Sequence, residues 1–509
     1  MKKILNYSWL AVILLFTVSC DKGFEDLNKN KTSPTSIDPT LLLNNAVINT
    51  SYPTITMIYD IGIVQQIITS NSGVVAGGNF NIENRPAGSI WAPYYQNVIK
   101  NTHDVIERTK DIPARSNLYN MARIFQAYAF MILTDEYGDI PYTEGGAGYS
   151  DQLFFPKYDA QQGIYTKLIQ ELTDAAAALN ASGKIETSDV LYAGNISKWK
   201  KFAYSLLLRA GMRIIKADAA KAQTTVLAAF NGGVITDNAD NAYMRHDGNY
   251  TLPIGNMLNG SESGNFYLAK PFVDQLKNTS DPRLSAIAIR YVGATSGGFG
   301  TANTNATNDP AKQFGMPVGS NDVTAKAAAN SIGLAHFYDF SQADRRRIVK
   351  TSAPCFFVTA SQTQLLLAEA RFRNWIPSGT AAQYFSGGIK AHMDQMVTYD
   401  AGCAVTAGPR DTYIAANPLG AGTELQQINT QYWISSFLNG PEAFANFRRS
   451  GFPALTPNPL PSPDIPPGTF IRRHTYLTNE LSVNTANLNA AIAAQGPDKL
   501  STRIWWDKP

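Results

Sequence analysis

The sequence contains little cysteine. Only three of its 509 residues are cysteines, at positions 20, 355 and 403. Small exported domains without a sufficient core depend on several disulfide bridges, and three cysteines exclude such a framework. Cys355 and Cys403 are enough for a single bridge, and the sequence leaves open whether they form it.

An excess of charge of either sign is also missing. The chain has 43 Lys and Arg side chains against 40 Asp and Glu. Without Lys2 and Lys3, which lie in an N-terminal leader, 43 minus 2 leaves 41 basic side chains and a net charge of +1. Proteins that bind nucleic acids usually present a strongly basic surface. We therefore expect no nucleic-acid partner.

The chain lacks the short motifs of common catalytic and metal sites. It has no zinc-protease helix, nucleophile elbow, dinucleotide fingerprint, phosphate-binding loop or EF-hand loop. Its five histidines are scattered, without the spacing of metal ligands on a helix: His103, His246, His336, His392 and His474. The sequence therefore predicts neither a cofactor nor a metal site.

Acidic residues cluster in one segment, at Asp135, Glu136, Asp139 and Glu144. Two of them would suit a glycoside hydrolase if the fold placed their carboxyl groups roughly 5 to 10 Å apart. The alternative is a helix that ends here, with Gly138 and Asp139 in the turn that follows it. Calcium binding is a third interpretation. We favour the turn, so the sequence predicts no catalytic residue and no enzyme.

The N-terminus has the layout of a secretory signal peptide. Lys2 and Lys3 precede an apolar run at residues 9–18, which is too short to cross a bilayer core of about 30 Å. A small residue and then Cys20 follow, as at the lipidation site of bacterial lipoproteins. We predict that residues 1–19 are removed and that Cys20 carries the lipid, which anchors the chain without a spanning helix. An ordinary signal peptide with a chance cysteine is the alternative.

Apolar residues recur at helical spacing in several segments. Within residues 118–132, 164–179 and 199–214, apolar side chains follow one another at intervals of three or four. These segments predict three helices, of which the last two form a hairpin. The spacing of Ser361 and Gln364 is typical of a capping box and predicts another helix there. The periodicity therefore predicts an all-α protein.

Composition divides the chain into parts. Residues 20–39 are polar and lack helical periodicity, which indicates a tether. Helical patterns occupy about 40–237 and 354–509, whereas about 238–353 is rich in Gly, Asn, Thr and Ser. That composition predicts long irregular loops, which often carry binding sites. We therefore predict that the ligand-binding region is about 238–353.

Dispersed blocks of this sequence resemble the SusD/RagB family of outer-membrane lipoproteins. The hallmark segment ends in Leu-Thr-Asp-Glu-Tyr-Gly-Asp-Ile-Pro-Tyr. The blocks are residues 122–142, 155–159, 199–213, 281–284, 354–370 and 503–507. The resemblance implies one domain over residues 40–509, in which tetratricopeptide-like helical hairpins form a superhelical scaffold with long irregular loops.

The resemblance also implies a function. Members of the family are anchored in the outer membrane by an N-terminal lipid and capture glycans for a TonB-dependent SusC-like transporter. We therefore expect a non-catalytic lipoprotein that faces the cell exterior, binds oligosaccharides and delivers them to such a transporter. Peptide binding in the same kind of complex is the main alternative. A surface glycoside hydrolase and a purely structural surface protein are the others.

Candidate ligand-binding residues are aromatic side chains with polar neighbours, because a sugar presents C–H faces and a hydroxyl edge. A Gly- and Asn-rich segment offers Asn79, Phe80 and Arg85, and Trp91 follows it. The region 238–353 offers a second group, made up of Tyr243, Arg245, Tyr250, Phe266 and Tyr267. Burial in the core is the competing interpretation for each of these rings.

Overall fold

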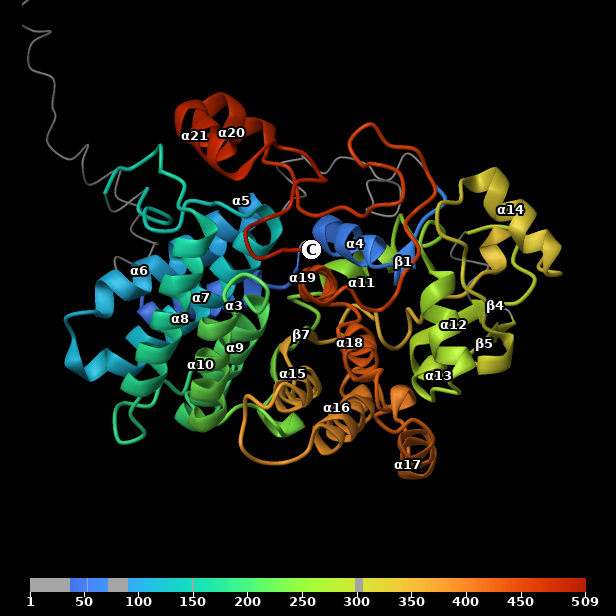
Figure 1. Cartoon of the computed structure of the whole chain (residues 1–509), viewed down its shortest axis with the longest axis horizontal. Coiled ribbons are helices and arrows are strands. Elements are labelled where there is room, and N and C mark those ends of the chain that lie inside the picture. Colours follow the sequence, from blue (N-terminus) through green and yellow to red (C-terminus); the bar gives the residue numbers. More distant parts are fainter. Residues whose placement is uncertain (1–36, 53, 72–89, 149–150, 298–304) are drawn as a thin grey trace, which may run out of the picture. The chain divides into compact units, whose positions relative to one another are not determined.

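The described chain is mainly helical and has the predicted all-α, tetratricopeptide-like fold (Figure 1). This computed structural model describes residues 37–52, 54–71, 90–148, 151–297 and 305–509. Pro39–Pro509 form one compact unit. The predicted lipid site Cys20 and the ligand candidates Asn79, Phe80 and Arg85 lie outside the described residues.

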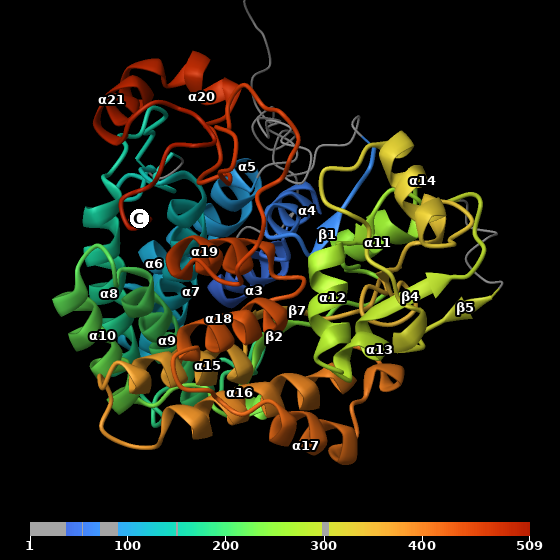
Figure 2. The same cartoon turned by 45° about the vertical axis from the view of Figure 1, so that its right-hand side comes forward.

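Helices of the N-terminal part run from residue 39 to residue 232. They are α3 (Pro39–Asn49), α4 (Thr54–Ile63), α5 (Trp91–Pro93), the π-helix η2 (Tyr94–Ile99), α6 (Lys100–Thr109), α7 (Ser116–Tyr137), α8 (Gln161–Ala178), α9 (Ile196–Arg213) and α10 (Ala219–Gly232). Among these, α7 packs against α8, α8 against α9, and α9 against α10, as a series of hairpins (Figures 1 and 2).

The predicted apolar faces are the buried faces of these hairpins. In α7 the side chains spaced from Leu118 to Ile132 are all buried, and in α9 Trp199, Phe202 and Leu206 are completely buried. Burying one such side chain contributes about 1.5–3 kcal/mol. Apolar residues at helical spacing therefore stabilise the hairpins, and the three helices predicted from residues 118 to 214 are confirmed.

Helices of the C-terminal part begin at residue 360. They are α15 (Ala360–Phe372), α16 (Ala381–Gln395), α17 (Ala407–Ala416), α18 (Glu424–Ser435), α19 (Gly440–Ser450), α20 (Thr478–Val483) and α21 (Thr485–Gln495). Helix α15 packs against α16 and α18, whereas α19 returns to α4 and α7 of the N-terminal part. The two parts therefore share one core.

The capping box of α15 lies two residues before its predicted place. Thr359 Oγ1 accepts a hydrogen bond from the Gln362 amide at 3.2 Å, and the Gln362 side chain accepts one from the Thr359 amide at 3.3 Å. Ser361 instead donates its hydroxyl hydrogen to the Gly388 carbonyl of α16 at 2.8 Å. The prediction of Ser361 and Gln364 was wrong because Ser361 already bonds a neighbouring helix.

Short elements fill much of the region between the two helical parts. Its helices are α11 (Pro253–Asn259), α12 (Lys270–Asn278), α13 (Arg283–Ile287) and α14 (Asp322–Ser331). The short strands lie in this region except for β1. They are β1 (Ile67–Ile68), β2 (Ala242–Met244), β3 (Tyr267–Leu268), β4 (Ala288–Tyr291), β5 (Ala306–Thr307), β6 (Gln342–Ala343) and β7 (Cys355–Val358). They pair antiparallel as β1-β3, β2-β7 and β5-β4-β6. Single 3-10 turns are Pro113–Arg115, Asn238–Asp240, Pro310–Lys312, Phe337–Asp339, Met396–Thr398 and Ala401–Cys403.

Buried ion pairs join helices that are distant in sequence. The Arg213 guanidinium of α9 lies 3.1 Å from Asp135 of α7 and 2.6 Å from Glu442 of α19. All three side chains are almost completely buried. Removing one partner of such a pair leaves an uncompensated buried charge, which is strongly destabilising.

Within the described residues, none of the helices is both long enough and apolar enough to span a membrane.

Candidate functional site

An open pocket of about 510 Å³ lies beside α5 and η2. Its other walls come from residues 141–148 and 153–156 and from the start of α20 (Thr478–Val483). Apolar lining is provided by Trp91, Tyr95, Pro141, Leu153, Phe154, Pro156 and Leu477. Polar lining is provided by Gln96, Lys100, Glu144, Asn479 and Glu480. Apolar walls with a few polar groups are typical of small-molecule sites of about 300–1,000 Å³.

The π-helix η2 shapes one wall of this pocket. It spans Tyr94–Ile99 and joins α5 directly to α6. A π-helical turn is wider than an α-helical turn and is frequent at functional sites. Tyr94 faces the core and is fully buried, whereas Tyr95 and Gln96 line the pocket. The Tyr95 hydroxyl donates to the Pro141 carbonyl at 2.6 Å, which ties η2 to the loop opposite.

Trp91 is held in place by a cluster of tyrosines. Its ring stacks on Tyr158 with centroids 6.0 Å apart and meets Tyr137 and Tyr476 edge-on, at 5.0 Å and 6.0 Å. Only 6% of Trp91 is exposed, at the pocket wall. The cluster therefore fixes the orientation of the part of the indole that faces the pocket.

Phe154 is the most exposed aromatic side chain of the lining. It is 68% exposed, and its neighbour Phe155 is 60% exposed but does not line the pocket. An exposed ring beside a cavity offers a flat apolar face to a ligand. Phe154 is not among the residues predicted from the sequence; the available signal was a pair of aromatic residues in a connection between two helices.

Acidic groups at the pocket have structural partners. Glu144 accepts a hydrogen bond from the Lys157 amide at 2.7 Å, and Glu480 accepts one from the Tyr158 hydroxyl at 2.7 Å. Burial and the nearby Glu480 carboxylate raise the pKa of Tyr158, so its hydroxyl stays protonated and continues to donate. The second bond joins Tyr158 to α20.

A second pocket of about 250 Å³ adjoins the first one. The two share Lys100 and Gly146, and the second is also lined by His103, Asp104 and Glu107 of α6. Its lining carries more charge than that of the first pocket. The two pockets together provide an aromatic half and a charged half along η2 and α6.

Of the predicted ligand residues that the structure describes, only Trp91 lines this pocket. Tyr243 packs on Phe356 of β7 with centroids 5.0 Å apart, and the Arg245 guanidinium covers the Tyr243 ring at 5.0 Å. Tyr250 is 54% exposed in a separate loop. The structure therefore brings Tyr243 and Arg245 together, but away from the pocket.

Phe266 and Tyr267 belong to the core. Phe266 is 3% exposed and Tyr267 is completely buried in β3. The Tyr267 hydroxyl donates to the Gly264 carbonyl at 2.6 Å. Because neither ring presents a face to solvent, we no longer count them as ligand candidates. Tyr267 pairs with Ile68 of β1, which is remote in sequence, and Phe266 directly precedes this strand.

The acidic segment around Gly138 is mostly interior. Asp135 accepts hydrogen bonds from the Tyr165 hydroxyl at 2.5 Å and the Trp506 ring nitrogen at 2.8 Å. Asp139 accepts one from the Gln161 amide at the start of α8, at 2.9 Å. Helix α7 ends at Tyr137, and Gly138 has a φ of 84°. These roles match the turn interpretation.

Comparison with known protein families gives one match that covers most of the chain. Residues 29–476 match the SusD-like family, which is described as starch-binding and associating with the outer membrane. Among curated proteins, none matches the chain.

Solved structures agree with this match. A chitin-binding protein is 31% identical, with a TM-score of 0.81, over 93% of this chain and 100% of its own. A SusD-like protein of Bacteroidetes AC2a is 26% identical, with a TM-score of 0.80 over the same shares. A chitin-binding SusD homolog from Flavobacterium johnsoniae has the same fold at 24% identity and a TM-score of 0.72, over 92% of this chain and 97% of its own. The chain therefore belongs to the SusD-like family of non-catalytic binding proteins that associate with the outer membrane.

Proposed function

We propose that this protein is a cell-surface lipoprotein that captures oligosaccharides and delivers them to a TonB-dependent SusC-like transporter. The observation that carries the proposal is the pocket between Trp91 and Phe154, in a chain whose family is described as starch-binding. Flat aromatic faces suit the C–H faces of sugar rings, and the polar groups Lys100, Asn479 and Glu480 suit their hydroxyls.

Oligosaccharides of N-acetylglucosamine are the first ligand class to examine. The support is the chitin-binding protein that is 31% identical to this chain and is matched over its own full length. The acetamido group of such a sugar adds a hydrogen-bond donor, an acceptor and a methyl group. Gln96 and Glu144 line the pocket beside the aromatic walls and are suited to the donor and acceptor.

The proposed domain plan places binding and anchoring in separate segments. Residues 1–19 are a signal peptide, residues 20–39 are a lipidated tether that begins at Cys20, and residues 40–509 are the SusD-like domain. The lipid holds the protein at the outer membrane, facing the exterior. Replacing Cys20 with Ser should release the chain from membranes, and retention of this variant in the membrane fraction would contradict the anchor.

Binding can be tested on the soluble mature chain by calorimetry. Chitin, starch and other plant or host oligosaccharides form the panel, and Phe154→Ala is the main variant. We expect affinity to fall about tenfold, because truncating a contact ring costs more than 1 kcal/mol. Phe155→Ala is the matched control, since this ring is equally exposed but outside the pocket lining. Equal effects of both variants would contradict the site.

The alternatives give different results in the same series. Peptides retained from a proteolysed protein mixture, with no glycan bound, would indicate a peptide carrier. Release of reducing ends would indicate a hydrolase. A loss of glycan affinity in Tyr250→Ala but not in Phe154→Ala would place the ligand at the loop that holds Tyr250. Co-purification of a TonB-dependent transporter with the lipidated chain would test delivery.

A further inference from the structure

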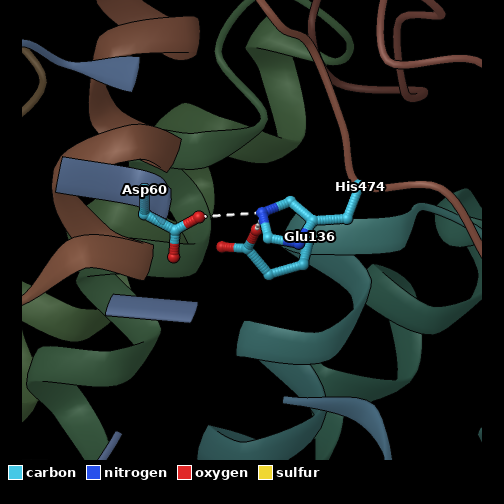
Figure 3. A group of neighbouring side chains, drawn as sticks. All are labelled: Asp60, Glu136 and His474. Atoms are coloured by element: carbon cyan, nitrogen blue, oxygen red, sulfur yellow. Dashed lines mark hydrogen bonds and ion pairs between the residues drawn. The ribbon is translucent and has the colours of Figure 1, made fainter. Parts of the chain in front are cut away.

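Three side chains with metal-binding groups meet inside the protein. Asp60 of α4, Glu136 of α7 and His474 of the C-terminal segment point toward one another (Figure 3). His474 Nε2 lies 2.8 Å from Asp60 Oδ1 and 2.9 Å from Glu136 Oε2. All three side chains are completely buried. None of the three residues lines the pocket beside Trp91. The inference drawn from them does not rest on the proposed function.

The surrounding structure holds the imidazole in this position. The His474 amide donates to the Glu136 carbonyl at 2.8 Å, so the backbone fixes the segment against the end of α7. The rings of Tyr59 and Tyr137 contact the imidazole with centroids 5.1 Å and 5.7 Å away. Because residue 474 is anchored in this way, both carboxylates face the same nitrogen.

The carboxylates are poorly satisfied by hydrogen bonds. One N–H on His474 Nε2 can point at only one of the two acids at a time. Within the described residues, Glu136 Oε1 and Asp60 Oδ2 accept no hydrogen bond, and Glu136 Oε2 has the ion pair with His474 Nε2 at 2.9 Å but no hydrogen bond. Carboxylate oxygens buried without such bonds are costly, and buried acids are normally paired or bound to a metal. A cation between them would satisfy several oxygens at once.

The geometry also fits a metal ion. One ligand atom from each residue can be chosen so that all three lie within 4.8 Å of one another. Around a tetrahedral zinc ion, ligand atoms are about 3.3 Å apart, given zinc bonds of about 2.0–2.2 Å. The distances of 2.8 Å and 2.9 Å need to widen only slightly. A carboxylate that binds through both oxygens can supply the fourth bond.

We propose that Asp60, Glu136 and His474 bind a divalent transition-metal ion of the zinc class. One imidazole nitrogen with two carboxylates suits zinc, manganese or iron, whereas calcium takes oxygen ligands only. The site is structural because it is buried from solvent on every side. It joins α4, α7 and the C-terminal segment through one ion.

Metal content of the refolded chain tests this proposal. Wild type, Glu136→Gln and His336→Gln are unfolded, stripped with a chelator and refolded with zinc. His336→Gln is the control, since His336 is a partly exposed imidazole outside the cluster. We expect about one zinc per chain in wild type and the control, and at least a tenfold loss in Glu136→Gln. Zinc should also raise the melting temperature of wild type and the control but not that of Glu136→Gln.

Two results would overturn the site. The first is equal zinc content in all three chains, which means surface binding. The second is a wild type without zinc and without a thermal shift, which means that an imidazolium alone joins the carboxylates. If Glu136→Gln does not fold, cobalt-loaded wild type decides instead. A visible d–d absorption band of tetrahedral intensity supports the site, and its absence overturns it.

Discussion

The guanidinium of Arg449 binds the carboxylate of Glu369 at two points, Nη1 to Oε1 at 3.0 Å and Nη2 to Oε2 at 2.9 Å. Arg373 adds a contact to Oε1 at 2.9 Å. Burial alone would raise the pKa of Glu369, but Arg449 and Arg373 outweigh it and lower the pKa to about 2. The pair joins α15 to α19.

Replacing Glu369 with Gln should lower the free energy of unfolding by about 3–5 kcal/mol, because it leaves Arg449 buried without its charge partner. Urea denaturation near neutral pH measures this. Glu107→Gln removes an exposed pair with Lys110 and should cost less than about 1 kcal/mol. Equal effects of the two variants would contradict the assigned role of Glu369.

The same carboxylate predicts loss of stability in acid. Folding lowers the pKa of Glu369 from 4.5 to about 2, so its contribution is complete above pH 4.5 and disappears as pH falls toward 2. Wild type should therefore lose stability over this interval, and Glu369→Gln should lose less. Parallel pH profiles of the two proteins would rule out this contribution.

Asp135 should be structural and not catalytic. Its carboxylate bonds Tyr165, Trp506 and Arg213, so Asp135→Asn should destabilise the chain by about 3–5 kcal/mol. Glu144→Gln is the comparison, since this residue lines the open pocket. We expect unchanged thermal stability for Glu144→Gln. An Asp135→Asn protein as stable as wild type would refute the interpretation.

Cys355 and Cys403 should react slowly with thiol reagents. Cys355 and Cys403 are free and buried, and burial raises the pKa of each thiol to about 12. Little thiolate is present at neutral pH, and the thiolate is the reactive form. A colorimetric thiol assay should detect both groups only after unfolding in denaturant. Rapid reaction of the folded protein would show that these side chains are accessible.

Tyr158→Phe separates stability from binding. The change removes the 2.7 Å bond to Glu480 but keeps the ring that stacks on Trp91. A hydrogen bond to a charged group contributes about 1.5–3 kcal/mol, so stability should fall by that order while glycan affinity changes little. Tyr384→Phe loses only a 3.4 Å exposed bond to Ser378 and serves as the control. A larger loss of stability in Tyr384→Phe than in Tyr158→Phe would contradict the role of the Tyr158 hydrogen bond.

Local pattern accounts for what the sequence could predict. The helix faces that begin at Leu118 and Trp199 are buried, as predicted. Residues three or four positions apart share one face of a helix, so the sequence alone shows which side chains lie together. Aromatic burial is not local in this sense. Phe266 and Tyr267 follow Gly and Asn residues, and Tyr267 is buried by segments far away in sequence, among them Ile68 of β1 and Met316.

The candidate pocket could be predicted only in part. Trp91 was accessible to sequence reasoning because it is a large ring just after a Gly- and Asn-rich segment. Phe154 and Glu480 reach the same pocket from segments far apart in the chain. No spacing rule relates such positions. The contact between Glu136 and His474 could not be predicted for the same reason, because histidines scattered through the sequence do not show the spacing of metal ligands.

Asp60 and His474 are 414 positions apart, so the cluster of Figure 3 has a consequence for synthesis. Helices α4 and α7 are made long before residue 474. Until that residue is made, the carboxylates of Asp60 and Glu136 have no imidazole between them, and their repulsion opposes the approach of α4 to α7. His474, near the C-terminus, therefore provides the partner that Asp60 and Glu136 need. A protein truncated before His474 should not reach its native core.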